Sequence, residues 1–331
     1  NLYRSSDGGR TFTPDAASEV HSDHHALWIN PANSNHLILG GDGGVDISWD
    51  RSDTWRQLRN LPLAQFYEIG VDMRDPYYVC GGLQDNGSWC APSQTLSDQG
   101  VRNRDWYNVH GGDGFYTVMD PDDPMVMIAE SQGGRVSRVD LKTMERLSIS
   151  PVARPNEEEE NRRYRGNWNT PIVLSVHDRS VYYIGYNHLL KSTDRGMSWQ
   201  EISPDITKQI ERSELEIMGE SEARMLSRHD GISSYGNMTT IGESALNASL
   251  IYIGTDDGNV QVTRDGGASW TDLTGNIPDL PERTYVSKVV PSLHVEARVY
   301  AVFDGHRNDD YGVYAYASED YGESWEEITT G

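Results

Sequence analysis

A recurring eight-residue turn pattern restricts this chain to a repeated β structure. The pattern is Ser/Thr-x-Asp-x-Gly-x-x-aromatic, and it occurs at Ser5–Phe12, Ser192–Trp199, Thr263–Trp270 and Ser318–Trp325, with a degraded copy at Ser48–Trp55. A short Asp accepts backbone N–H bonds within its own turn, and Gly supplies the positive φ that closes the turn. Each copy therefore predicts a hairpin corner whose aromatic residue returns to the apolar layer. In the degraded copy, Ser52 takes the place of the glycine.

A second pattern recurs between these turns and predicts the strands. It consists of an apolar strand, an Asp/Asn/Pro turn, a second apolar strand and a Gly-rich loop. Units of this kind begin near residues 24, 66, 115, 172, 238 and 286. Repeats of this length, each built from four strands, are typical of circular all-β folds. Residues 1–13 contain only the outer hairpin of an incomplete unit.

The turns resemble the Asp-box, or BNR, repeat of sialidases, sortilin-like receptors and two-propeller xyloglucanases. The resemblance implies an all-β β-propeller with four-stranded antiparallel blades and Asp-box hairpins on the rim. Six full units and the partial one imply seven blades, with the ring seam outside the chain. In those families the box carboxylates are structural, and here they are Asp7, Asp50, Asp194, Asp265 and Asp320.

Longer phrases resemble bacterial BNR-like, sortilin-like propeller proteins that are often labelled glycosyl hydrolases. These phrases are HSDHHALWINP (21–31), GGLQDNGSW (81–89), GGDGFYTVMDP (111–121), RGNWNTPIVLS (165–175), STDRGMSW (192–199) and GTDDGNVQVTRDGGASW (254–270). The resemblance covers nearly the whole chain and implies the fold. It implies no common reaction.

The chain reads as one domain over residues 1–331, since all-β propellers often reach this length. Two interruptions stand out. Residues 151–169 form a charged linker, and residues 204–235 form an insertion with partial helical periodicity. The incomplete first unit and the absence of a leader sequence indicate a mature or trimmed fragment of a larger protein with further domains.

The charge balance argues against two classes of partner. Asp and Glu number 51 against 28 Lys and Arg, which gives a net charge of -23. Nucleic acids and anionic membrane surfaces would be repelled. The chain also lacks an apolar run long enough to enter a membrane. The acidity is explained either by a well-solvated surface or by a face that binds cations or neutral sugars.

The two cysteines, Cys80 and Cys90, flank a Gly/Asn-rich turn. Opposite arms of one hairpin could place them within disulfide reach, and a disulfide and two free thiols both remain open at this stage. A disulfide would favour a secreted, periplasmic or cell-surface protein.

In a propeller, the obvious site is the end of the central channel where the inner strands begin and the loops between second and third strands project. Polar and aromatic groups gathered there suit a carbohydrate or protein ligand. The candidate ligand-binding residues are His24, His25, Asp42, Gln84, Asn86, Gln132, Trp168, Asn169, Tyr186, Asp256, Asp257 and His306.

Two chemistries remain open among these residues. Asp85, Asp113 and Glu130 are the candidates for an acid/base pair that cleaves glycosidic bonds, against a role in capping turns. Asp23 and His24 could bind a divalent cation, against a role as hydrogen-bonded channel lining. Because adjacent strand residues point to opposite faces, only part of the His-rich cluster can share one ion. No cofactor is required by any other motif.

The leading prediction is an extracytoplasmic propeller that binds carbohydrate or protein. The alternatives are a xyloglucanase-like glycoside hydrolase and one half of a two-propeller enzyme.

Overall fold

The computed structural model describes residues 1–14, 16–61, 63–151, 164–210 and 234–329. Within these ranges the regular elements are strands and three short 3₁₀ helices, η1 (Asn103–Asp105), η4 (Thr274–Asn276) and η5 (His306–Asn308). These helical segments are too short to cross a membrane. The all-β prediction is confirmed.

The strands form six antiparallel sheets of four strands, and in each sheet the strands follow one another in chain order. The first sheet contains β1 (His24–Ile29), β2 (Leu37–Gly41), β3 (Gly44–Ser48) and β4 (Arg56–Gln57), and the second contains β5 (Phe66–Val71), β6 (Tyr78–Leu83), β7 (Gly87–Pro92) and β8 (Tyr107–His110). The third contains β9 (Gly114–Met119), β10 (Val126–Ser131), β11 (Arg135–Asp140) and β12 (Arg146–Ser148), and the fourth contains β13 (Ile172–Leu174), β14 (Tyr182–Gly185), β15 (Leu189–Ser192) and β16 (Gln200–Glu201). The fifth contains β17 (Met238–Glu243), β18 (Ile251–Thr255), β19 (Val260–Thr263) and β20 (Thr271–Asp272), and the sixth contains β21 (Tyr285–Pro291), β22 (Val299–Asp304), β23 (Tyr314–Ser318) and β24 (Glu326–Glu327).

The six sheets correspond to the six predicted units, whereas a seventh blade is not confirmed. In the predicted outer hairpin of residues 1–13, the described pairing is a single antiparallel bridge between Arg4 and Thr13. Of the predicted insertion, residues 211–233 lie outside the described residues, and the flanking residues 204–210 and 234–235 contain no helix. Residues 152–163 of the charged linker also lie outside them.

Four of the five box turns join the third strand of a sheet to its fourth strand. In the fifth sheet, Oδ1 of Asp265 accepts the backbone N–H of Ser269 at 2.8 Å and Oδ2 accepts its hydroxyl at 2.6 Å, while Gly267 N donates to Thr263 Oγ1 at 2.9 Å. The same bonds recur around Asp7, Asp50, Asp194 and Asp320. Each turn thus satisfies its own polar groups, as the spacing predicted.

The box turns also connect neighbouring sheets. The indole nitrogens of Trp199 and Trp270 donate to the carbonyls of Ile149 and Ile202, at 2.8 and 2.9 Å, which directly follow the fourth strand of the preceding sheet. Gly267 lies so close to Ile202, with φ at 103°, that a Cβ would meet its carbonyl oxygen at 2.6 Å. A glycine is therefore required here by both conformation and space.

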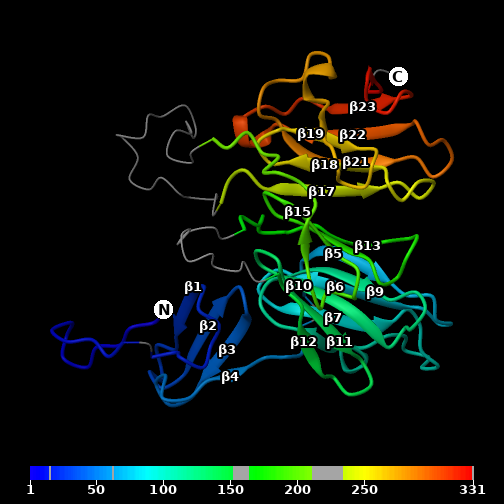
Figure 1. The fold of residues 1–331 in the computed structure, drawn as a ribbon. Helices are drawn as coiled ribbons and strands as arrows, with labels where there is room; N and C mark the ends of the chain where they lie inside the picture. Colours follow the sequence, from blue (N-terminus) through cyan, green and yellow to red (C-terminus); the bar gives the residue numbers. More distant parts are fainter. Residues whose placement is uncertain (15, 62, 152–163, 211–233, 330–331) are drawn as a thin grey trace.

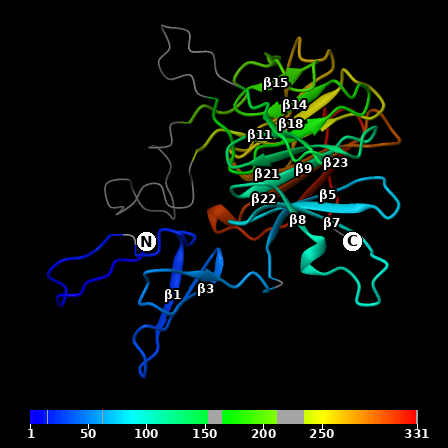
Figure 2. The same ribbon diagram turned by 90° about the horizontal axis from the view of Figure 1, so that it is seen from below.

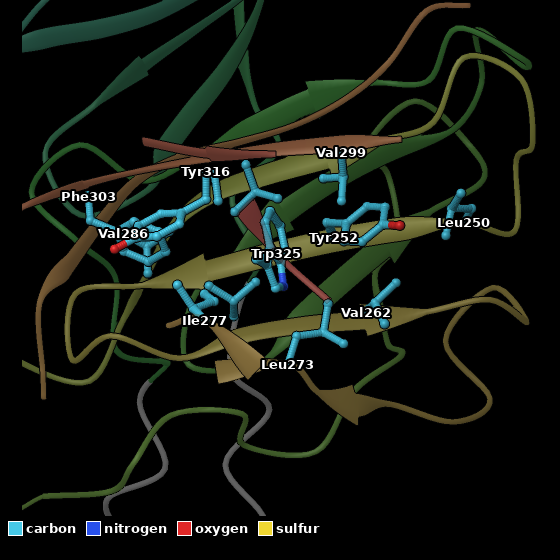
Figure 3. Close-up of a cluster of buried hydrophobic side chains, with 13 residues drawn as sticks. Leu250, Tyr252, Val262, Leu273, Ile277, Val286, Val299, Phe303, Tyr316 and Trp325 are labelled. Atoms are coloured by element: carbon cyan, nitrogen blue, oxygen red, sulfur yellow. The ribbon is translucent and has the colours of Figure 1, made fainter. Parts of the chain in front are cut away.

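The buried apolar side chains gather between successive sheets, from the second to the sixth. Figure 3 shows the cluster between the fifth and sixth sheets, where Trp325 lies among Tyr252, Leu273, Ile277 and Tyr316. Comparable clusters lie between the second and third, the third and fourth, and the fourth and fifth sheets. Five sheets therefore pack through apolar faces, as propeller blades do.

The first sheet is different. In the described part of the chain, none of the four buried clusters includes a residue of β1–β4, and Leu27, Trp28 and Ile29 of β1 are between 44 and 51% exposed. Figures 1 and 2 both show this sheet beside the packed group of five. Trp55 nevertheless donates to the carbonyl of Ala16 at 2.9 Å, so the first sheet contacts Ala16 in the way that the fourth and fifth sheets contact their predecessors.

Cys80 and Cys90 pair directly across β6 and β7 and form a disulfide. Both residues are completely buried in the cluster between the second and third sheets. The alternative left open by the sequence is thereby resolved in favour of the disulfide.

The box carboxylates predict a specific acid sensitivity. Hydrogen bonds from Ser269 and Thr263 lower the pKa of Asp265 from 3.8 to about 2. A lowered folded-state pKa contributes stability that is present above 3.8 and is lost as the pH falls toward 2. We expect Asp265→Asn to lower the melting temperature at neutral pH. Between pH 3.8 and about 2, the melting temperature of the variant should fall less than that of the unmodified protein. Melting curves followed by circular dichroism measure this, with the exposed Asp98→Asn as the control; equal acid slopes in all three proteins would contradict it.

Candidate functional site

The candidate site lies at one end of the sheets, which we call the loop end, where the first strand begins and the loop between the second and third strands turns. The two segments are joined by the same backbone bond in three sheets: Asp42 N to Asp23 O, Gln84 N to Gln65 O, and Asp256 N to Asn237 O, at 2.9 to 3.1 Å. The sequence therefore predicted correctly that strand starts and loops meet.

In five of the six sheets, the pairing between the first and second strands contains a register shift. The shift lies at or near the loop end in each of these sheets. In the first and second sheets the shift falls at His25 and Tyr67, between His24 and Ala26 and between Phe66 and Glu68. A bulge re-aims side chains that a regular strand would point to alternate faces. This feature decides which residues meet at the loop end.

Asp113 joins the second, third and fourth sheets at this end. Its side chain is only 8% exposed, its Oδ1 accepts the backbone N–H of Asp85 at 3.1 Å, and its Oδ2 accepts the indole N–H of Trp168 at 3.2 Å. Burial and the charges of Asp113 and Asp42 raise the pKa of Asp85, while His21 opposes the shift. Two of the three predicted catalytic residues are thus adjacent, and the pKa of one of them, Asp85, is raised.

Two aromatic side chains lie beside these carboxyls. Trp168 is 45% exposed, and Tyr67 is 37% exposed and stacks on Phe115 with ring centroids 4.5 Å apart. Burial and the charges of Asp113 and Asp85 raise the pKa of Tyr67. The sequence analysis did not select Tyr67, although its position at the start of an inner strand was a usable signal.

The first sheet contributes a second group of polar residues. His25 Nε2 lies 2.7 Å from Asp42 Oδ1, and Asn86 Nδ2 donates to the carbonyls of Asp42 and Gln84 at 3.3 and 2.9 Å. His24 instead interacts electrostatically with the buried Asp46 of β3. Gln132 lies in the loop between β10 and β11 of the third sheet, next to Gly112. A Cβ placed on Gly112 would lie 2.5 Å from Oε1 of Gln132.

Glu130, the third predicted catalytic carboxyl, is fully buried. It accepts the backbone N–H groups of Tyr116, Gly134 and Thr170 at 3.3 to 3.4 Å, and burial raises its pKa well above the ordinary value. Its bonds join the third sheet to the segment that precedes β13. This environment is that of a carboxyl that holds backbone segments together.

Other predicted ligand-binding residues are also bonded within the protein. Asp256 accepts the backbone N–H groups of Gly236 and Asn237 at 3.0 and 2.7 Å, and burial raises its pKa to about 6. Asp257 is fully buried and accepts the backbone N–H of Lys208 at 2.7 Å, and the buried Tyr186 donates to Gly134 O at 2.9 Å. The exposed His306 lies 2.6 Å from Asp304.

The sequence analysis missed a polar network between the inner strands. Glu68 Oε1 accepts Asn169 Nδ2 at 3.1 Å, and Lys288 Nζ lies 3.9 Å from Glu68 and 3.4 Å from the hydroxyl of Tyr116. Glu68 and Lys288 stand in otherwise apolar strands, β5 and β21, and that interruption was the available signal. The network joins four sheets.

No family model matches the chain, and no curated protein matches it in sequence. Among solved structures, an ancestral GH74 enzyme is similar, with a TM-score of 0.53 and 14% identity over 93% of this chain and 38% of that one. The chain is a β-propeller.

Two further structures complete the comparison. YCF48 from Cyanidioschyzon merolae has a TM-score of 0.49 at 12% identity, over 93% of this chain and 86% of that one. The GH74 xyloglucanase from Xanthomonas campestris has a TM-score of 0.32 at 12% identity, over 92% of this chain and 58% of that one. The propeller spans 38% of the length of the ancestral GH74 enzyme. At these identities the likeness concerns the fold.

Proposed function

We propose that this propeller is an extracytoplasmic module that binds a carbohydrate or protein ligand at its loop end. The observation that carries the proposal is the exposed face of Trp168, whose indole edge is bonded to Asp113 and which lies beside the exposed Tyr67. An aromatic face held in position by a hydrogen bond is suited to stacking on a sugar ring or to burial under an apolar side chain of a partner.

The polar surroundings support a neutral, hydroxyl-rich ligand. Carboxyl groups of Asp42, Asp85 and Asp113 offer planar acceptors, and Asn86 offers an amide, all at the same end of neighbouring sheets. With a net charge of -23, the protein would repel an acidic polysaccharide. Neutral glycans are therefore the first ligands to test.

An oxidising compartment fits the covalent structure. The completely buried Cys80–Cys90 disulfide is typical of proteins that fold outside the cytoplasm. The resemblance of the turns to Asp-box repeats of sortilin-like proteins supports the same location.

A glycoside hydrolase is the second candidate, and the pairing of Asp85 with Asp113 favours it. A carboxyl with a raised pKa beside a second carboxyl is the arrangement that glycosidases use for a general acid and its partner. In this version the chain is one half of a two-propeller enzyme, in keeping with the 38% of the GH74 enzyme that it covers.

Trp168→Ala tests the binding proposal. We expect the variant to bind its glycan or protein partner about 30-fold more weakly, since truncating an aromatic anchor costs about 2 kcal/mol. A glycan array and a pull-down with the unmodified protein identify the ligand, and calorimetry compares the variants. Trp49→Ala is the matched control, because Trp49, which directly follows β3, is 63% exposed and stacks on His36. Equal losses in both variants, or an unmodified protein that captures nothing, would contradict the proposal.

The hydrolase version is tested on a panel of β-glucans by release of reducing sugar. If the chain is a hydrolase, we expect Asp85→Asn and Asp113→Asn each to lower the rate of sugar release by about 100-fold or more, because a positioned acid or base contributes that much. A protein that binds a glycan but cleaves none of the panel would retain the first proposal and exclude the second.

A further inference from the structure

His21, Asp23 and Asp85 come together at the loop end from two different sheets. Each offers one ligand atom, and these atoms all lie within 4.8 Å of one another. His21 and Asp23 precede β1, whereas Asp85 occupies the loop between β6 and β7. The group replaces the predicted pair of Asp23 with His24, because His24 interacts with Asp46 instead.

The backbone holds these three residues in place. Gly43 allows the loop after β2 to lie against His21, because a Cβ at this position would lie 2.3 Å from the Cβ of His21. Gly41 allows the end of β2 to lie against Asp23 in the same way, because a Cβ there would meet the carbonyl oxygen of Asp23. Asp85 has a positive φ of 62° and donates its N–H to Asp113. The three side chains therefore start from fixed positions.

One ligand atom lacks a hydrogen-bonding partner. Nδ1 of His21 is buried and forms no hydrogen bond, and its separation of 3.8 Å from Asp23 Oδ2 is too long for one. Two ligands of a metal ion, each about 2.0–2.2 Å from it, are separated by roughly this distance. An imidazole nitrogen without a hydrogen-bonding partner, close to two carboxylates, forms a donor set that suits a metal ion.

The surrounding charge favours a cation. Asp113 accepts the backbone N–H of Asp85, Asp42 accepts the side-chain amide of the neighbouring Asn86 through its carbonyl, and Asp23 adds a further carboxylate. A bound divalent cation would neutralise two of these carboxylates directly and screen the others.

We propose that His21, Asp23 and Asp85 bind a divalent cation that links the first sheet to the second. One imidazole and two carboxylates form a mixed nitrogen and oxygen set, which suits Zn²⁺ better than the all-oxygen preference of Ca²⁺ or Mg²⁺. Water completes the coordination, because Asp23 is exposed.

Such a link has a structural consequence. In the described part of the chain no buried apolar cluster joins the first sheet to the second, and the loops of His21 and Asp85 are among the points where they meet. The cation would therefore fix the position of the first sheet. The cation site shares Asp85 with the proposed ligand site but does not require a ligand at Trp168.

The test is titration of the chelator-treated full chain with ZnCl₂, with MnCl₂ and CaCl₂ as parallel arms, by calorimetry and equilibrium dialysis. We expect one Zn²⁺ per chain, bound more tightly than Ca²⁺. His21→Gln, Asp23→Asn and Asp85→Asn should each weaken it by about 10- to 100-fold, as loss of a ligand or its support does. Asn tolerates the positive φ of residue 85, so that variant keeps the loop. His294→Gln and Asp98→Asn, both exposed, are the matched controls.

Hydrogen exchange supplies a second readout. Zn²⁺ should slow amide hydrogen exchange in residues 24–57 of the unmodified protein. In the Asp85→Asn variant, Zn²⁺ should leave the exchange rates of these residues unchanged. Several results would overturn the site: Zn²⁺ bound equally by the three variants and the two controls, no Zn²⁺ bound at all, or Ca²⁺ bound more tightly with no effect of His21→Gln. Glycan binding is measured on the same samples, so that failure of this site and failure of the proposed function are distinguished.

Discussion

Glu130→Ala is expected to destabilise the protein by about 3–5 kcal/mol, because it removes a buried side chain together with the acceptor of several backbone groups. The carboxyl is fully buried and accepts three backbone N–H groups, from Tyr116, Gly134 and Thr170. In the variant these donors would stay buried without a partner. Urea unfolding followed by circular dichroism measures the loss.

Glu130→Gln separates the shape of the side chain from its charge. The amide fills the same volume and keeps one acceptor, so the loss should be about 1–2 kcal/mol, the cost of one unsatisfied buried group. Because burial raises the folded-state pKa of Glu130 above 4.5, its stabilising contribution is present below that value and is lost as the pH rises through the folded-state pKa. The stability advantage of the unmodified protein over Glu130→Gln should therefore shrink as the pH rises. An advantage that grows with pH would contradict this environment for Glu130.

Trp325→Ala should cost about 3–5 kcal/mol, as truncation of a buried aromatic side chain does. Trp325 is 8% exposed and lies within the cluster that joins the fifth and sixth sheets, near Tyr252 and Leu273. Its removal leaves a cavity between two sheets. The melting temperature and the urea midpoint both report the change.

Trp55→Ala is the comparison within the same sequence motif. Trp55 occupies the equivalent position of its box turn, is half-buried and donates to Ala16, but it belongs to the sheet that no buried cluster includes in the described residues. We expect a loss of about 1 kcal/mol, close to that of one hydrogen bond. Equal losses for Trp55 and Trp325 would show that the motif, and not the packing between sheets, sets the stability.

Local patterns explain why much of the fold could be predicted from the sequence. The hydrogen bonds of Asp265 reach only four residues along the chain, so the spacing of the motif was enough to predict the turn. Strands joined by a short loop, such as β18 and β19, could likewise be predicted to pair because they are neighbours in the chain. Cys80 and Cys90 lie on opposite arms of one hairpin, which placed them within reach. Each of these features depends on neighbours in the chain.

The site could be predicted only in part, because it depends on contacts between sheets. The register shift between His24 and Ala26 ends the regular alternation there, and the cation group that we propose contains His21, whereas the sequence prediction named Asp23 and His24. Glu68 and Lys288 are 220 residues apart, and nothing in either strand alone indicates their proximity. Glu130 was predicted as a candidate catalytic acid, but it lies in β10, and its burial arises from the third sheet and the segment before β13 together.

The indole bonds between sheets also have a direction along the chain. Trp55, Trp199 and Trp270 each donate to a carbonyl that was synthesised before them, at Ala16, Ile149 and Ile202. Each of these three box turns therefore finds its partner carbonyl already made when it emerges from the ribosome. Domains and repeats that assemble in this order expose less apolar surface during translation. These three bonds can therefore form in the order of biosynthesis.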